Sequence, residues 1–170
     1  MSLSIREATV QDAANIANVH VVSWRESYQG IVPQPYLDSL DVGVRTESWK
    51  SRLDQGVATV FVAVLDGQLC GFISGGKARE SIQDFDGEFF AIYLLRAAKG
   101  RGIGRLLMRR LAETLLAEGL TKGLVWVLAD NPTRHFYEHL GAQEVARKME
   151  PVGGADLLEI AYGWQDIRAL

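Results

Sequence analysis

The sequence predicts a single α+β domain, and three observations support this. The chain has 170 residues, a length typical of one domain and short for two. Segments with the alternating or continuous apolar pattern of strands occur near the start, in the middle and at the end. Between them lie segments with the 3.6-residue period of amphipathic helices. Apolar residues make up 48% and charged residues 23%, so we expect an ordinary globular core.

The first part of the chain predicts one strand and two helical regions. Residues 3–7 form the strand pattern. A helix follows from Thr9, because Thr9 and Asp12 have the spacing of a capping box, with Asp in place of Glu. Residues 31–35 contain two prolines and end this helix, and a second helical region then covers residues 36–54.

The middle of the chain predicts a hairpin, a third strand and a long helix. Strands at residues 58–65 and 68–77 are separated by Asp66-Gly67, a typical tight turn. Another strand covers residues 88–95. Residues 102–118 form an amphipathic helix, because leucines repeat along one face while arginines lie on the other.

The last third of the chain predicts two more strand patterns around a short helix. Residues 124–129 are almost continuously apolar, as in a strand inside a sheet. A helix follows over residues 132–140 and stops at Gly141. Residues 143–150 and 156–164 then form a closing hairpin.

The strongest functional signal is the run Lys99-Gly100-Arg101-Gly102-Ile103-Gly104-Arg105 between a strand and a helix. Its glycines allow backbone amides to approach a ligand, and amides at a helix start favour phosphate oxygens. Residues 89–112 contain six basic and no acidic residues, which also indicates an anionic ligand. The spacing excludes a P-loop and a dinucleotide fingerprint. A glycine-rich turn without a ligand is the alternative.

These residues resemble the GCN5-related N-acetyltransferase (GNAT) family. Residues 99–104 match its signature of Arg or Gln, two residues, Gly, one residue, then Gly or Ala, except that Lys99 stands where Arg or Gln is usual. Residues 92–95 are similar to the strand that precedes this signature. Residues 131–141, with an Asn, a Phe-Tyr pair and a Gly, are similar to the second cofactor motif of the family.

The resemblance implies a mixed, mostly antiparallel sheet, splayed between its fourth and fifth strands and flanked by about four helices. Acetyl-CoA would lie in the gap. Backbone groups of strand four would pair with the pantetheine arm, and the glycine-loop amides would bind the diphosphate. The cofactor-binding residues that it implies are Leu94, Leu95, Lys99, Gly100, Arg101, Gly102, Ile103, Gly104, Arg105 and Asn131.

Two residues are candidates for catalysis. The resemblance places Tyr137 beside the sulfur of coenzyme A, where its phenol can protonate the leaving thiolate; the alternative is core packing beside Phe136. Glu88 lies eleven residues before Lys99, the separation of the base glutamate in the histone-acetylating branch. It would share a strand face with residues 90, 92 and 94, and a solvated strand-end acid is the alternative. Asn131 before Pro132 also fits a helix cap.

By the same resemblance, Trp24, Tyr28 and Trp126 line the acceptor pocket, with core packing as the alternative for the two tryptophans. The three histidines have no metal-ligand spacing with carboxylates or with Cys70, so we expect no metal site. No Ser-His-Asp grouping or nucleophile elbow is present, which favours direct transfer over an acyl-enzyme.

Composition restricts the partners. The net charge of −3 argues against a nucleic-acid binder, and a transferase for RNA-bound substrates is therefore disfavoured. Uncharged apolar runs are too short to span a bilayer, and a single cysteine without a secretion pattern favours the cytoplasm. The resulting hypothesis is a monomeric or homodimeric N-acetyltransferase. It would transfer acetyl from acetyl-CoA to a primary amine of a small molecule or peptide in a ternary complex, the alternative being a silent acetyl-CoA sensor or scaffold.

Overall fold

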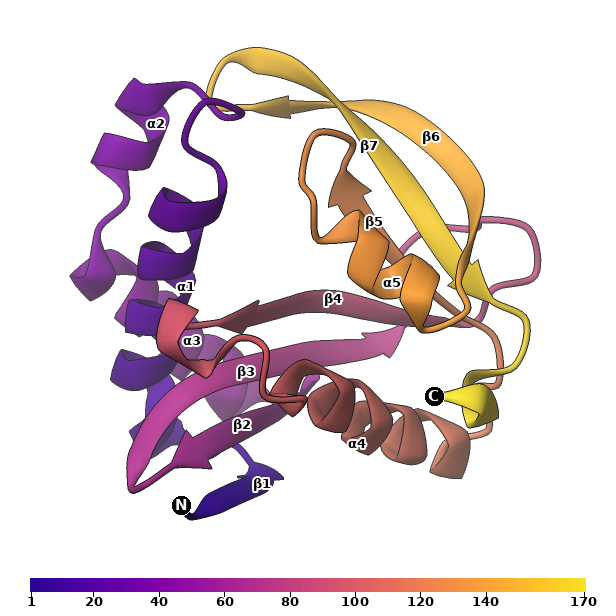
Figure 1. Ribbon diagram of the computed structural model, residues 1–170, viewed down its shortest axis with the longest axis horizontal. Helices are drawn as coiled ribbons and strands as arrows, with labels where there is room; N and C mark the ends of the chain where they lie inside the picture. Colours follow the sequence, from indigo (N-terminus) through magenta and orange to yellow (C-terminus); the bar gives the residue numbers. More distant parts are fainter.

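A single seven-stranded sheet runs through the computed structural model, which describes residues 1–170 (Figure 1). The strands lie in the order β1-β2-β3-β4-β5-β7-β6. Their bounds are β1 Leu3–Glu7, β2 Thr59–Leu65, β3 Gln68–Lys77, β4 Gly87–Leu94, β5 Gly123–Leu128, β6 Gln143–Val152 and β7 Ala155–Trp164. The helices are α1 Ala13–Ser27, α2 Gln34–Ser39, α3 Val42–Gln55, α4 Ile103–Ala117 and α5 Arg134–His139. Short 3-10 turns cover Val10–Asp12, Arg96–Ala98 and Ile167–Ala169.

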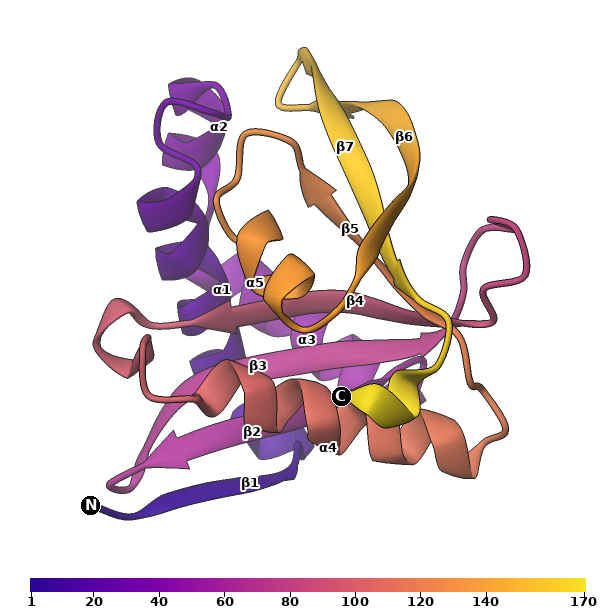
Figure 2. The ribbon, with the colours of Figure 1, turned by 45° about the vertical axis from the view of Figure 1, so that its right-hand side comes forward.

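The sheet is mixed and splits at its centre. All neighbouring strands are antiparallel except β4 and β5, which run parallel. These two strands pair only from Gly87 opposite Gly123 to Phe89 opposite Val125. Beyond that point β5 and the β6–β7 hairpin turn away from β4 (Figure 2). The predicted splay between the fourth and fifth strands is therefore confirmed.

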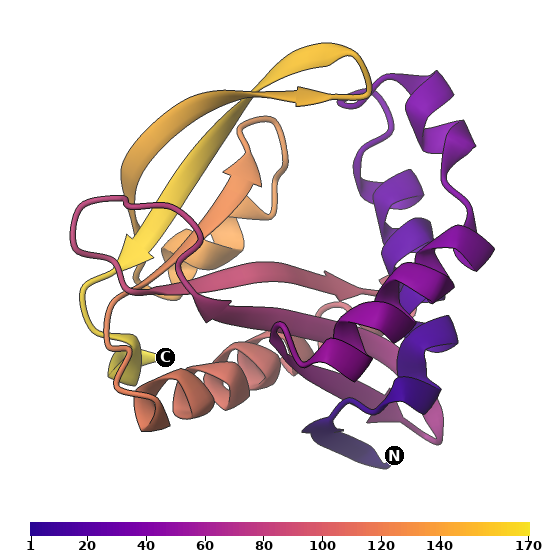
Figure 3. The same cartoon turned by 180° about the vertical axis from the view of Figure 1, so that it is seen from behind.

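Helices cover both faces of the β1–β4 half of the sheet. The helix α4 packs on one face, while α1 and α3 lie on the other (Figures 1 and 3). The buried leucines of α4, Leu107, Leu111 and Leu115, recur every four residues and face the sheet, as the amphipathic pattern predicts. None of the helices combines the length and apolar character needed to cross a bilayer.

The N-terminal helical segments differ from the prediction in two places. Thr9 and Asp12 do form a capping box, with Thr9 N donating to Asp12 Oδ2 at 2.8 Å, but the α-helix proper starts at Ala13. The predicted helix over residues 36–54 is two helices. Leu40 is extended, with ψ 129°, and the Asp41 carboxylate accepts a hydrogen bond from Val44 N at 2.9 Å. Asp41 therefore caps a new helix.

A β-bulge changes which face each residue of β4 occupies. The pairing of β3 with β4 shifts register between Ser74 and Gly75, so that Phe90 is an extra residue. Phe89 consequently belongs to the apolar cluster under α4 together with Ile92. In a regular strand these two residues would lie on opposite faces.

Candidate active site

A cavity of about 550 Å³ lies where β4 and β5 diverge. Its walls come from β4, β5, the glycine loop with the start of α4, and the segment around α5. The splayed strands supply the space, since no strand pairs with the β5-facing edge of β4 beyond Phe89. Thirteen of the 23 lining residues are apolar, which is typical of a cleft for an organic ligand.

The glycine loop presents a row of free backbone donors to this cleft. None of the six amides from Gly100 to Arg105 donates a hydrogen bond within the chain. Gly100 and Gly102 have φ of 75° and 77°, and Gly102 is the N-cap of α4. Only glycine adopts this conformation without strain, so these residues turn the loop and aim its amides at the cleft. The positive end of the α4 dipole adds to the attraction for an anion.

The side chains of the loop divide into two groups. Lys99 and Arg105 line the cleft and supply positive charge. Arg101 does not, because its guanidinium folds back, with Nε donating to Ala97 O at 3.1 Å and Nη1 lying 3.1 Å from Met1 Sδ. At Gly104 a side chain would meet the Phe136 ring at 3.2 Å, so glycine permits α5 to approach α4 closely.

Of the two residues predicted to pair with the pantetheine arm, only one lies on the edge of β4 that faces the gap. Leu94 lines the cleft, while Leu95 N donates to Cys70 O at 2.8 Å and Leu95 lies outside the lining. Because backbone groups alternate between the two edges of a strand, Ile92 and Leu94 face the gap. Ile92, which the sequence analysis missed, takes the place expected for Leu95. The Leu94 carbonyl oxygen already accepts one hydrogen bond, from Ser23 Oγ at 3.3 Å.

Tyr137 lies in the wall of the cleft and is 4% exposed. Its phenol makes no hydrogen bond within the chain, and the ring packs edge-on against Trp164. Burial raises the pKa of Tyr137 well above its usual value, and the nearby phenol of Tyr28 adds to the increase. The hydroxyl therefore keeps its proton at neutral pH and is free to donate it.

Asn131 connects the β5–α5 loop to α1. Its Oδ1 accepts from Thr133 N at 3.0 Å, which closes a turn before the helix; the predicted helix cap is wrong, because Thr133 is the N-cap of α5. Its Nδ2 donates to Tyr28 Oη at 3.3 Å. Asn131 and Tyr28 are each 6% exposed and line the cleft. The helix itself begins at Arg134, two residues later than expected.

A second cavity of about 410 Å³ lies on the other side of the gap from the glycine loop. It shares Tyr28, Phe90, Tyr93, Trp126 and Val127 with the first cavity, so the two form one passage between β4 and β5. All three residues predicted to line an acceptor pocket lie here: Trp24 in the second cavity, Tyr28 and Trp126 in both.

The structure does not bring Glu88 into this passage. The bulge places it on the face opposite Ile92 and Leu94, in the part of β4 that is paired with β5, contrary to the expected shared face. Its carboxylate accepts from Arg79 N at 3.0 Å and from Arg79 Nη2 at 2.6 Å, and the residue is 2% exposed. Both oxygens are thus occupied, and Glu88 offers no free base to an amine.

Three acidic residues of the passage, Glu80, Glu150 and Glu159, escaped the sequence analysis, and Glu159 is the one without an ion pair. Glu159 lies in β7, opposite Leu128 of β5, and lines the second cavity. It sits within a predicted strand where neither spacing nor neighbours distinguish it from a solvated residue. Only the pairing of β5 with β7 brings it to the cavity, so no local signal was available.

Comparisons with known proteins agree with this geometry. A sequence model of the acetyltransferase (GNAT) family matches residues 15–142. A protein of Bacillus subtilis (strain 168), named as the uncharacterized N-acetyltransferase YuaI, is 40% identical over 169 residues, which cover 99% of this chain and 96% of that protein. Both the family match and this identity extend over most of the chain.

Solved structures share the fold. The PaiA N-acetyltransferase of Thermoplasma acidophilum, in complex with coenzyme A, has a TM-score of 0.69 at 20% identity, covering 96% of this chain and 100% of that one. The putative acetyltransferase yncA of Salmonella typhimurium, with acetyl-CoA, has a TM-score of 0.72 at 20% identity, covering 97% and 94%. The splayed sheet, the family match and the close relative together show that this chain belongs to the GNAT family of acetyltransferases.

Proposed function

We propose that the protein transfers the acetyl group of acetyl-CoA directly to a primary amine, with both substrates bound in the passage between β4 and β5. The observation that carries the proposal is the row of six free amides, Gly100 to Arg105, at one end of a passage that runs through the sheet. The acceptor is a small molecule or a peptide. Two relatives of the same fold are described with coenzyme A or acetyl-CoA bound, which supports this choice of acyl donor.

The residues at the glycine loop fit the diphosphate of coenzyme A. Two adjacent phosphates offer several oxygens within a few ångströms, and unpartnered amides on consecutive residues are matched to such a group. Lys99 and Arg105 add charge on the same side of the cleft. Ile92 and Leu94 expose strand backbone toward the gap, where an extended arm with amide groups can add as if it were a strand.

Tyr137 is the group we assign to leaving-group protonation. Acetyl-CoA supplies a thioester that a neutral amine attacks at the carbonyl carbon, which breaks the carbon–sulfur bond. The phenol of Tyr137 is protonated at neutral pH and has no partner in the chain, so it can donate its proton to the departing sulfur. The attacking nitrogen is protonated in the adduct and loses this proton to solvent as the neutral amide forms, while the phenolate of Tyr137 takes up a proton from solvent, which restores the phenol.

The two-sided passage supports direct transfer. The acyl donor enters from the glycine-loop side and the acceptor from the second cavity, and their reacting groups meet among the shared residues Tyr28, Tyr93 and Trp126. Apolar walls remove water from this point, which protects the thioester from hydrolysis. Holding both groups in one geometry supplies much of the rate enhancement without a covalent enzyme intermediate.

The proposal is tested by measuring thiol release from acetyl-CoA over a library of amines and lysine peptides, together with calorimetry of coenzyme A binding. We expect binding, and thiol release above the amine-free rate for at least one acceptor. Gly102→Val, folded as judged by its melting temperature, should bind coenzyme A at least about 10-fold more weakly, because a β-branched residue is strained at φ 77°. Binding without any release would favour the sensor alternative, and absence of binding would refute both.

A further inference from the structure

The second cavity carries an excess of negative charge. The charged side chains of its wall are those of Glu80, Glu150 and Glu159, with the cations Arg79 and Lys148. Three carboxylates therefore face two cations, and Arg79 is also paired with the buried Glu88. An uncompensated charge in a partly enclosed cavity attracts a ligand of the opposite sign, because the surrounding low dielectric screens it poorly.

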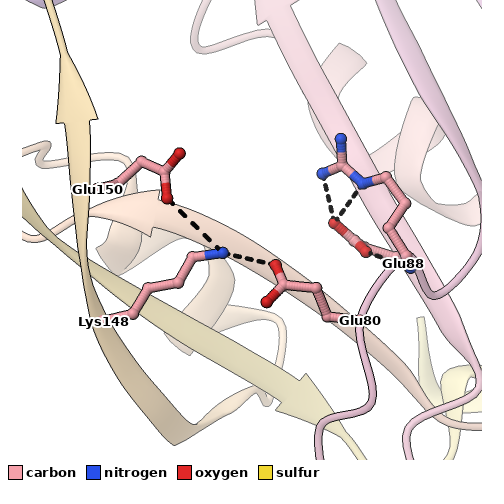
Figure 4. A network of polar contacts seen from close by, with 5 residues as sticks. Glu80, Glu88, Lys148 and Glu150 are labelled. Carbon is pink, nitrogen blue, oxygen red and sulfur yellow. Dashed lines mark hydrogen bonds and ion pairs between the residues drawn. The ribbon is translucent and has the colours of Figure 1, made fainter.

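The two cations are already paired. Arg79 is bound to Glu88, and its guanidinium stacks on the Phe90 ring at 4.3 Å. Lys148 Nζ lies 2.6 Å from Glu80 Oε1 and 3.9 Å from Glu150 Oε2. Figure 4 draws both contacts as dashed lines. The Lys148–Glu80 contact joins β6 to the loop between β3 and β4, on the wall of the cavity. Both cations still attract Glu159 at longer range, but neither forms an ion pair with it.

Glu159 is the carboxylate without a partner. Lys148 stands opposite it in the β6–β7 register, yet the ammonium turns to Glu80, and Glu159 makes no hydrogen bond or ion pair. Burial raises the pKa of Glu159, and the nearby carboxylates of Glu150 and Glu80 add to the increase against the attraction of Lys148. A cation placed beside Glu159 would offset the cost of its burial.

The aromatic walls of the cavity are also suited to a cation. Trp24, Tyr28, Tyr93 and Trp126 line it, and ring faces attract ammonium groups. Trp126 already holds one, because Lys148 Nζ lies 4.2 Å from the centre of its ring. The same cavity thus combines an unpaired carboxylate with aromatic faces, the two features that recognise an alkylammonium ion.

Distance separates this charge from the expected reaction point. Glu159 is opposite Leu128, two residues along β5 from Trp126, one of the residues around the expected reaction point. At about 3.3 Å per residue, this is about 7 Å along the strand. A nitrogen that attacks a thioester must be uncharged, so the cation held by Glu159 is a different group of the acceptor.

We propose that Glu159 selects acceptors that carry a second positive charge, binding one ammonium group while a separate, neutral amine reaches the thioester. This inference rests on the proposed acetyl transfer and names its acceptor class: alkyl diamines and polyamines with several carbon atoms between nitrogens. Acceptors that carry a carboxylate in place of the second ammonium are repelled by the same charges.

The test compares acceptors that share length and differ only at the far end. Diamines of three to six carbons, the monoamines of equal length and the corresponding ω-amino acids are assayed with acetyl-CoA. We expect kcat/KM for the best diamine to exceed that of its monoamine at least about 10-fold, with ω-amino acids poorest. Monoamines or ω-amino acids that react as well as diamines would overturn the inference.

Variants connect the preference to Glu159. Glu159→Gln should lower kcat/KM for diamines about 10-fold, mainly through KM, and leave monoamines within about twofold. Glu113→Gln, an exposed residue of α4 remote from the cavity, is the control for the change in net charge and should leave both unchanged. An unaltered diamine preference in Glu159→Gln would overturn the assignment.

Binding measurements separate this inference from the transfer activity. If no amine is acetylated, calorimetry with protein loaded with coenzyme A still compares 1,6-diaminohexane with hexylamine. Tighter binding of the diamine, lost in Glu159→Gln, would support the acceptor site while the transfer proposal fails. Equal binding of the two amines would overturn the acceptor site itself.

Discussion

Tyr137 and Glu88 are both buried, yet only the phenol of Tyr137 is free of hydrogen-bond partners in the chain. Arg79 occupies both oxygens of Glu88 and fixes it as a structural ion pair at the junction of β4 and β5. Breaking such a buried pair is costly, whereas the Tyr137 hydroxyl is available for chemistry. Reactivity at the residue scale therefore depends on unsatisfied groups as much as on residue type.

Replacing Tyr137 by Phe tests the assigned acid. The ring packing is kept and only the hydroxyl is lost, so we expect kcat to fall about 100-fold with little change in the affinity for coenzyme A. Steady-state kinetics and calorimetry measure the two effects. Glu113→Gln serves as the comparison, because an exposed residue of α4 outside the passage should not alter the pH profile of kcat. A full-rate Tyr137→Phe enzyme would remove the phenol from the mechanism.

His20 on α1 makes stability depend on pH. Burial lowers its pKa to about 3, with Arg45 and Arg52 adding repulsion, and Trp49 Nε1 donates to its Nδ1 at 3.3 Å. The unfolded chain takes up the proton at its ordinary pKa of 6.5, while the folded chain stays unprotonated to about 3. Acidification through this window therefore favours unfolding.

From pH 7 to pH 5 we expect His20 alone to lower the free energy of unfolding by about 2 kcal/mol. Urea denaturation of the wild type and His20→Gln at both pH values measures it. Glutamine retains an acceptor for Trp49 but does not titrate, so the variant should lose less stability on acidification. Equal losses in the two proteins would show that His20 is not the group responsible.

At the scale of elements, glycines in β3 allow β4 and α4 to approach closely. A Cβ on Gly75 would lie 2.6 Å from Glu88 O and 2.6 Å from Leu111 Cδ2. The same residue marks the register shift that turns Glu88 away from the cleft. The bulge and the packing of α4 thus depend on one position, and α4 in turn positions the free amides at its N-terminus.

Gly75→Ala should destabilise the fold by about 2 kcal/mol or more, because a backbone oxygen and a packed leucine must both move. Gly76→Ala is the matched control: its Cβ would meet the Phe90 ring at 3.6 Å, an ordinary contact, so we expect a clearly smaller loss. Urea denaturation compares the two. Similar stabilities for both variants would contradict the packing described here.

At the scale of the whole molecule, the order of elements and the splayed sheet were predicted correctly, because hydrophobic period, turn residues and the glycine loop are local signals. The face of the sheet that Glu88 occupies was predicted wrongly, because the β-bulge depends on how β3 pairs with β4. The only local indication of a bulge was the pair of glycines, Gly75 and Gly76, within a predicted strand. Glu159 reaches its cavity only through the β5–β7 pairing.

Within the site, too, local sequence motifs predicted the segments correctly but not every side chain. Tyr137, Asn131 and most of the glycine loop line the cleft as their motifs implied. Leu95 and the Arg101 side chain lie outside it. Backbone groups alternate between the two edges of a strand, so the Leu95 amide points to Cys70 of β3. The Arg101 guanidinium is held by a hydrogen bond to Ala97 O. A motif specifies which segment meets the ligand, while packing decides which atoms do.

The most direct test of the central claim is an amide NMR titration of the protein with coenzyme A. We predict that the amide resonances of Gly100 to Arg105 shift more than any others, because these are the donors without partners that receive the diphosphate. Saturation with large shifts elsewhere, and none in residues 100–105, would contradict the account.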